Sequence, residues 1–146
     1  MKPVSVYIHI PFCMHRCGYC DFNTYAGINE LIPAYARALS REIEFQAKNV
    51  NEPIEIKTIY FGGGTPSLLP VHEIDLILTT LFTCFRSNSP PEITVEANPG
   101  TVTPKYFKDL HTLGVNRVSL GMQSSDRNEL HLLGRIHTYD DVVNAV

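Results

Sequence analysis

Three cysteines lie within eight residues near the start of the chain, at positions Cys13, Cys17 and Cys20. Thiolates are soft ligands, and a tight loop of them selects iron–sulfur clusters, zinc or Cu(I). A cubane cluster held by only three cysteines keeps one iron without a protein ligand, so this iron can bind another molecule. The spacing C-x3-C-x2-C therefore predicts an iron–sulfur site with an open coordination position.

A structural zinc site is the competing interpretation, with His9 or His15 as the fourth ligand of a tetrahedron. Compact zinc sites usually combine C-x2-C with a second pair of cysteines, and the chain has only Cys84 besides the clustered three. Cys84 lies within an apolar helical pattern, where a cysteine is expected to be a small buried side chain. The spacing favours iron–sulfur and leaves zinc as the alternative.

Three further features carry polar or backbone groups that could bind a ligand. The run of glycines at residues 62–64, followed by Thr65, either forms a tight turn or brings bare backbone close to a ligand; it lacks the sequence of a phosphate-binding loop. Glu96 interrupts an apolar stretch, so it needs a partner, either a cation or the hydroxyls and amines of a ligand. Arg135 follows a glycine in a predicted loop, where a solvated charge is the simpler interpretation.

Alternating strand and helix patterns position these residues along the chain. Strands are predicted at residues 4–10, 56–61, 93–97 and 115–122. Helices are predicted at residues 29–49, 70–85, 103–114 and 126–133, and from residue 138 onward. The cysteine loop, the glycine run, Glu96 and Gln123 all follow the carboxyl end of a strand, which is the edge where α/β folds bind ligands.

Four strand-and-helix units imply parallel strands with right-handed crossovers, as in a doubly wound sheet or a β/α barrel. The strands have one polar face, formed by Tyr7 and His9, by Thr94 and Glu96, and by Arg117, Ser119 and Gln123. Their apolar faces, expected to lie under the helices, comprise Val6 and Ile8, Val95 and Ala97, and Val118 and Leu120. Because buried parallel strands are normally apolar on both faces, a polar face favours a barrel whose interior is a working site.

The length of the chain predicts only part of such a barrel. Eight strands and about 250 residues are typical of a closed (β/α) barrel, whereas the chain has 146 residues and four predicted units. We therefore expect residues 1–146 to form the N-terminal portion of a barrel domain that belongs to a longer protein.

Composition narrows the classes of function. A net charge of −3 gives no electrostatic reason to expect nucleic acid or an anionic membrane as a partner. No apolar run reaches the roughly 18 residues of a transmembrane segment, and the first residues lack the features of a signal peptide. Clustered cysteines without such a signal indicate a metal site in a reducing compartment, so a cytoplasmic location is expected.

The motifs resemble a known family. The three cysteines, with Tyr19 just before the last, are similar to the signature of the radical S-adenosylmethionine (SAM) superfamily. Five segments resemble the oxygen-independent coproporphyrinogen III oxidase group: residues 7–13, 62–67, 96–99, 120–124 and 133–137. After Cys20, where the oxidase has Gly-Cys, this chain has Asp21 and Phe22, as in the HemW-like heme chaperone branch. A coproporphyrinogen oxidase remains the alternative within the group.

The resemblance implies a partial TIM-like (β/α) barrel and a specific cofactor chemistry. Cys13, Cys17 and Cys20 would hold a [4Fe–4S] cluster, whose open iron would chelate the amino and carboxylate groups of SAM. An electron from the cluster would cleave SAM to a 5′-deoxyadenosyl radical. Other implied partners are heme or a porphyrinogen, an electron donor and a second copy in a homodimer. The difference at Asp21 argues against decarboxylation of coproporphyrinogen, and no side chain is assigned an acid–base or nucleophilic role.

Motif positions also imply a set of SAM contacts. These are Tyr7, Tyr19, Gly63, Gly64, Thr65, Glu96, Gln123 and Arg135. Tyr7 would lie beside SAM at the cluster, and Tyr19 would pack on the adenine side. The glycine run would line the methionine part of SAM and a second SAM site. Glu96 would accept hydrogen bonds from the SAM amine or ribose, and the planar fork of Arg135 suits a carboxylate.

Overall fold

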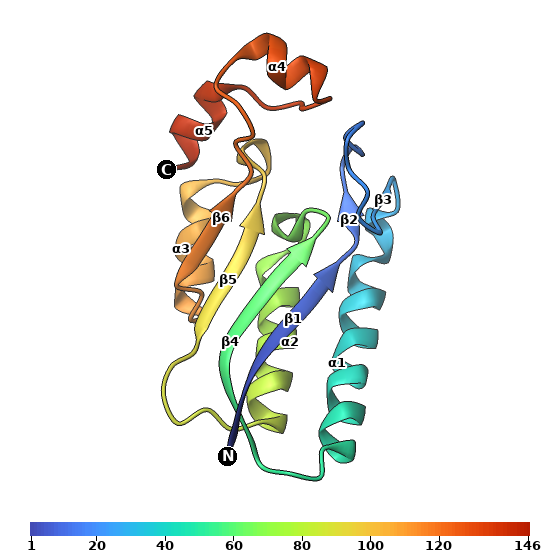
Figure 1. Ribbon diagram of the computed structural model, residues 1–146, viewed down its shortest axis with the longest axis vertical. Helices are drawn as coiled ribbons and strands as arrows, with labels where there is room; N and C mark the ends of the chain where they lie inside the picture. Colours follow the sequence, from blue (N-terminus) through green and yellow to red (C-terminus); the bar gives the residue numbers. More distant parts are fainter.

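The computed structural model describes residues 1–146 and contains a parallel sheet with the strand order β1-β4-β5-β6. These strands are β1 (Lys2–Ile10), β4 (Ile54–Gly63), β5 (Glu92–Ala97) and β6 (Arg117–Leu120). The connecting helices are α1 (Ile32–Asn49), α2 (Val71–Cys84) and α3 (Pro104–Thr112), and they cover one face of the sheet (Figure 1). The predicted partial (β/α) barrel architecture is confirmed.

The hydrophobic core lies between this face of the sheet and the helices. The strict alternation in β1 buries Ile8 and Ile10, and the same period in β5 buries Val95 and Ala97. One prediction about the faces is wrong, because the side chain of Val118 in β6 is 41% exposed. The reason is that no helix packs closely on β6, whose substantial contacts are with β5 alone. The strand is also four residues long instead of the predicted eight.

Helix starts largely follow the predicted caps. Thr103 accepts a hydrogen bond from the Tyr106 amide at the start of α3, and Thr138 forms a capping box with Asp141 at the start of α5 (Tyr139–Ala145). The predicted start at Asn29 is wrong: residues Asn29–Leu31 form the 3₁₀ turn η1, and α1 begins at Ile32. Pro70 lies just before α2 rather than in its first turn.

Several short elements gather at the carboxyl ends of the strands (Figure 1). Strand β2 (Phe12–Cys13) pairs with β3 (Tyr25–Ala26), which ties down both ends of the cysteine loop. The 3₁₀ turns η2 (Pro66–Leu68) and η3 (Pro99–Thr101) follow β4 and β5. Helix α4 (Arg127–Leu132) and helix α5 follow β6. None of the helices is long and apolar enough to cross a membrane.

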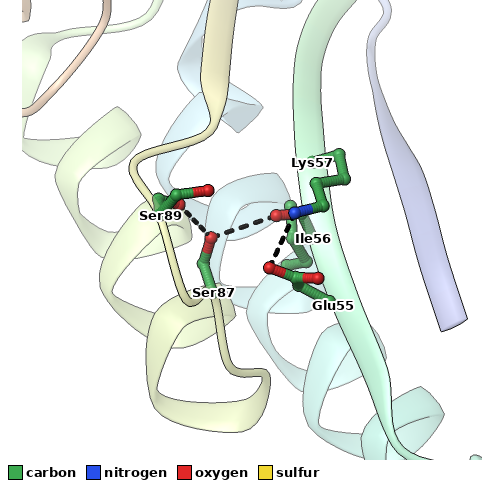
Figure 2. Close-up of polar contacts among 5 residues, drawn as sticks. All are labelled: Glu55, Ile56, Lys57, Ser87 and Ser89. Atoms are coloured by element: carbon green, nitrogen blue, oxygen red, sulfur yellow. Dashed lines mark hydrogen bonds and ion pairs between the residues drawn. The ribbon is translucent and has the colours of Figure 1, made fainter. Parts of the chain in front are cut away.

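The opposite end of the sheet carries contacts between structural segments (Figure 2). Ser87, in the loop after α2, donates a hydrogen bond to the carbonyl of Ile56 over 3.0 Å and also contacts the carbonyl of Ser89. Nearby, Lys57 Nζ lies 2.8 Å from Glu55 Oε1 and lowers the pKa of this carboxyl group. The hydrogen bond from Ser87 to Ile56 attaches the α2–β5 loop to β4 at this end of the sheet.

Candidate functional site

A cavity of about 230 Å³ lies at the carboxyl end of the sheet. Ten of the eleven residues singled out from the sequence line it: Cys13, Cys17, Tyr19, Cys20, Gly63, Gly64, Thr65, Glu96, Gln123 and Arg135. The cysteine loop, the ends of β4 and β5, and the segments after β6 thus contribute to one surface. Tyr7 is the member of the predicted set that the lining does not include.

The three clustered cysteines are free thiols on the wall of this cavity. Cys13 lies in β2 and is 7% exposed, whereas Cys17 and Cys20 are half-buried in a turn closed by the Cys20 amide donating to the Cys17 carbonyl. No three side chains of His, Cys, Asp or Glu lie close enough together to hold one metal ion. Three thiols on a shared cavity are the donor set that a cluster takes, because each cysteine ligates a different iron.

The two histidines considered as zinc ligands lie in different settings. His15 lines the cavity. His9 does not, and both of its ring nitrogens already have partners in the protein. His9 Nε2 lies 2.9 Å from the carbonyl of Asn23, which can only accept, so Nε2 carries the proton. His9 Nδ1 then accepts from the hydroxyl of Tyr7 over 3.2 Å.

The glycine run packs directly against the strand that carries Cys13. The Gly64 amide donates to the Ile10 carbonyl over 2.8 Å, and the Thr65 amide donates to the Phe12 carbonyl over 2.7 Å. A Cβ on Gly64 would lie 2.6 Å from the Phe12 carbonyl oxygen and 3.0 Å from Cys13 Sγ. The close approach of this backbone to the cysteine therefore requires glycine at position 64.

Gly63 has a second reason to be glycine. Its φ of 116° lies in the region that side chains rarely adopt, and a Cβ there would lie 2.6 Å from the ring of His9. The amide of Gly63 points to the site and donates to Glu96 Oε2 over 3.2 Å.

Glu96 has neutral partners rather than a cation. The hydroxyl of Tyr60 donates to Glu96 Oε1 over 2.7 Å, and the Gly63 amide contacts the other oxygen. Burial, followed by the hydrogen bond to the Glu96 carboxylate, raises the pKa of Tyr60. Sequence reasoning missed Tyr60, although the period of β4 places this hydroxyl two residues before Gly62 on the same face.

Arg135 is held in place by the protein itself. Its Nη2 donates to Asn98 Oδ1 over 2.6 Å and to the Gly121 carbonyl over 2.8 Å, and its Nη1 donates to Cys17 Sγ over 3.6 Å. The interpretation of Arg135 as a solvated charge is therefore wrong. Asn98 was not singled out from the sequence, although it lies in the 96–99 segment and lines the cavity.

Two aromatic side chains and one amide complete the set that was predicted from the sequence. Tyr19 lines the cavity, and burial raises the pKa of its hydroxyl while Arg135 opposes this shift. Tyr7 is 58% exposed, and its ring stacks on Tyr60 with the centroids 6.2 Å apart. Gln123 has a φ of 63°, a left-handed conformation that is uncommon for a residue with a side chain. Gln123 follows the end of β6 and lines the cavity.

The fold and this arrangement agree with the sequence relationships. Residues 7–146 match the family described as the radical SAM superfamily, and the chain belongs to this family. The family implies a [4Fe–4S] cluster and SAM as cofactors, and the donor set of the cavity fits both.

Among curated relatives, the chain is similar to heme chaperones named HemW. It is 41% identical over 140 residues to the one from Mycobacterium tuberculosis and 42% identical over 139 residues to the one from Escherichia coli. Each match covers 94% of this chain and 36% of the relative. The chain therefore spans little more than a third of the length of these relatives.

Among solved structures, the chain is similar to the coproporphyrinogen III oxidase HemN from Escherichia coli, which is described as a radical SAM enzyme. The TM-score is 0.88 at 28% sequence identity, and the match covers 97% of this chain and 32% of that one. The predicted relationship to the oxidase group and its heme chaperone branch is confirmed.

Proposed function

We propose that the cavity binds a [4Fe–4S] cluster through Cys13, Cys17 and Cys20 and holds SAM beside it. The observation that carries this proposal is that three free thiols share one cavity with bare glycine backbone, a carboxylate and a guanidinium. When bound, a reduced cluster supplies the electron that cleaves SAM. The protein supplies position and electrostatics for this chemistry.

The partners of Glu96 leave it able to bind a ligand. A carboxylate has about four lone-pair sites, and Tyr60 and Gly63 occupy two of them. The remaining sites can accept from the ammonium group of SAM or from its ribose hydroxyls. Because Tyr60 and Gly63 each hold one oxygen, the Glu96 carboxylate is oriented before a ligand binds.

Arg135 has fewer free donors than the sequence suggests. A guanidinium carries five N–H groups, and three of them are directed to Asn98, Gly121 and Cys17. Two N–H groups remain for the carboxylate of a ligand. We propose that Arg135 both orients the cysteine loop and binds SAM, with Gln123 and Tyr19 closing the same pocket and Tyr7 beside it.

For the complete protein we propose heme binding and transfer, in the manner of the HemW-named relatives, in the cytoplasm. Asp21 after Cys20, where the oxidase group continues to a fourth cysteine, supports this branch. Residues 1–146 would form the N-terminal part of its radical SAM domain. Heme would be bound outside the cavity described above.

Anaerobic reconstitution with iron and sulfide tests the cluster. We expect the complete protein to gain the broad visible absorbance of thiolate-bound iron, and Cys13→Ala to lose it. Cys84→Ala is the matched control and should retain it, because Cys84 lies in α2 away from the cavity. Stoichiometric zinc without iron would contradict the proposal.

Two assays on the cluster-loaded complete protein test the rest. With SAM and a reductant it should release 5′-deoxyadenosine, and Glu96→Gln should weaken SAM binding. With hemin it should bind heme and pass it to an apo-acceptor. Conversion of coproporphyrinogen would instead assign the protein to the oxidase branch.

A further inference from the structure

A continuous chain of hydrogen bonds joins two of the cysteines through Arg135, Asn98 and Thr65. Arg135 donates to Cys17 Sγ over 3.6 Å and to Asn98 Oδ1 over 2.6 Å. Asn98 Nδ2 donates to Thr65 Oγ1 over 3.2 Å, and Thr65 Oγ1 donates to Cys13 Sγ over 3.8 Å. Each end of the chain therefore places a donor on a sulfur atom.

The chemistry of the groups fixes the direction of these hydrogen bonds. A guanidinium can only donate, so the atom of Asn98 that faces Arg135 must be the amide oxygen. The NH₂ group of Asn98 consequently faces Thr65 and makes its hydroxyl oxygen an acceptor. The hydroxyl hydrogen of Thr65 is then free to point to Cys13 Sγ. The orientation of one amide thus decides whether Cys13 receives a donor.

The backbone of Asn98 is itself held by a closed ring of hydrogen bonds. Its amide donates to Ser67 Oγ over 3.3 Å, and its carbonyl accepts from Thr101 Oγ1 over 2.8 Å. The hydroxyls of Ser67 and Thr101 lie 2.6 Å apart and complete the ring. Because η2 and η3 supply these hydroxyls, Asn98 is fixed at the junction of the β4 and β5 segments. A side chain anchored in this way can act as a rigid support.

We propose that Asn98 is a positioning residue that directs Thr65 and Arg135 onto the sulfurs of Cys13 and Cys17. This inference rests on the proposed cluster site. Hydrogen bonds to cysteine sulfurs stabilise the more negatively charged, reduced form of a cluster and so raise its reduction potential. Asn98 therefore makes the cluster easier to reduce without touching it.

A redox titration of the reconstituted complete protein, without SAM and followed by the spectroscopic signal of the reduced cluster, tests the inference. In Asn98→Ala we expect full iron content and a midpoint potential about 59 mV more negative, which corresponds to a tenfold loss of reduced cluster for a one-electron couple. Thr65→Val removes the donor to Cys13 and the acceptor of the Asn98 amide but leaves the Arg135 donor on Cys17, so it should shift the midpoint less. In the double variant the midpoint should shift by less than the sum of the two single shifts, because both substitutions interrupt the same chain of hydrogen bonds.

Asn116→Ala is the matched control. Asn116 also uses both ends of its amide, accepting from the Ile93 amide and donating to the Pro91 carbonyl, but it lies at the other end of β5. Its replacement should leave the potential unchanged even if it lowers stability. If the loss of a structural asparagine were enough to change the midpoint potential, Asn116→Ala would change it too.

The outcomes separate the inference from the function on which it rests. Failure of the wild-type protein to take up a cluster would overturn both. Full loading of wild type and Asn98→Ala with equal midpoints would overturn the positioning role and leave the cluster site intact. If Asn98→Ala does not fold, the Thr65→Val titration decides, and an unchanged midpoint there overturns the inference.

Discussion

Gly64→Ala tests whether the contact between the glycine run and β2 builds the site. The new Cβ would lie 2.6 Å from the Phe12 carbonyl oxygen and 3.0 Å from both Cys13 Sγ and the Ile10 carbonyl oxygen. Two of these three atoms belong to backbone, which cannot move aside as the end of a flexible side chain can. The substitution must therefore push the glycine run away from the cysteine strand.

The expected cost follows from the contacts that would be lost. Overpacking by one methyl group in a tight site costs about 1–3 kcal/mol. Moving the run also stretches two hydrogen bonds, from the Gly64 amide to the Ile10 carbonyl and from the Thr65 amide to the Phe12 carbonyl. Each is worth about 0.5–1.5 kcal/mol. We expect a loss of about 2–6 kcal/mol of unfolding free energy, together with a large loss of bound iron.

Gly18→Ala is the control within the same loop. A Cβ on Gly18 would meet no heavy atom within 4 Å, so stability and iron content should stay close to wild type. Urea unfolding and iron analysis of the complete protein measure both quantities. If Gly64→Ala matched Gly18→Ala in stability and iron content, the close packing of residues 63–65 on β2 would not be what shapes the site.

Three other perturbations address the fold. Tyr106 donates to the Leu69 carbonyl, and burial raises its pKa above 10.0. Because folding favours the protonated form, the unfolding free energy should fall as the pH rises above about 10. Urea unfolding at several pH values should show a smaller fall in Tyr106→Phe. Ile59→Ala should cost about 2–5 kcal/mol by calorimetry, whereas Val118→Ala on the exposed edge should change stability by less than about 0.5 kcal/mol. Thr103→Ala should lose about 1 kcal/mol with the cap of α3, and an unchanged melting temperature would contradict the cap assignment.

The order and type of the main elements could be predicted because local patterns decide them. The period of two in β1 and β5 and the proline and threonine signals at helix starts depend on neighbours in sequence. Val118 shows the limit of this reasoning, since its exposure depends on whether a helix packs on its strand. Alternation gives the face on which a residue lies, and only tertiary packing decides what covers that face.

In the site, too, local sequence patterns predicted some features and tertiary contacts decided the others. The cysteine spacing and the positions of Gly63, Gly64 and Glu96 after strands predicted a shared edge, because parallel strands end together. The roles of Tyr60 and Asn98 could not be predicted, because they depend on partners 36 and 37 residues away. The residue type of Arg135 suggested a guanidinium with all its donors free for a ligand. In the structure most of these donors are directed to groups of the protein, Asn98 among them.

The fold holds the three cysteines with different firmness before a cluster binds. Cys13 belongs to a strand, is 7% exposed, and packs against Gly64 and Thr65. Cys17 and Cys20 lie in a turn that is closed by the Cys20 amide on the Cys17 carbonyl and by Arg16 on the Cys20 carbonyl. Arg135 donates to Cys17 Sγ from outside the turn. Because binding a cluster must order whatever is not already fixed, most of that ordering falls on the turn. Arg135 and its support Asn98 limit this cost for Cys17, since Arg135 already donates a hydrogen bond to its sulfur.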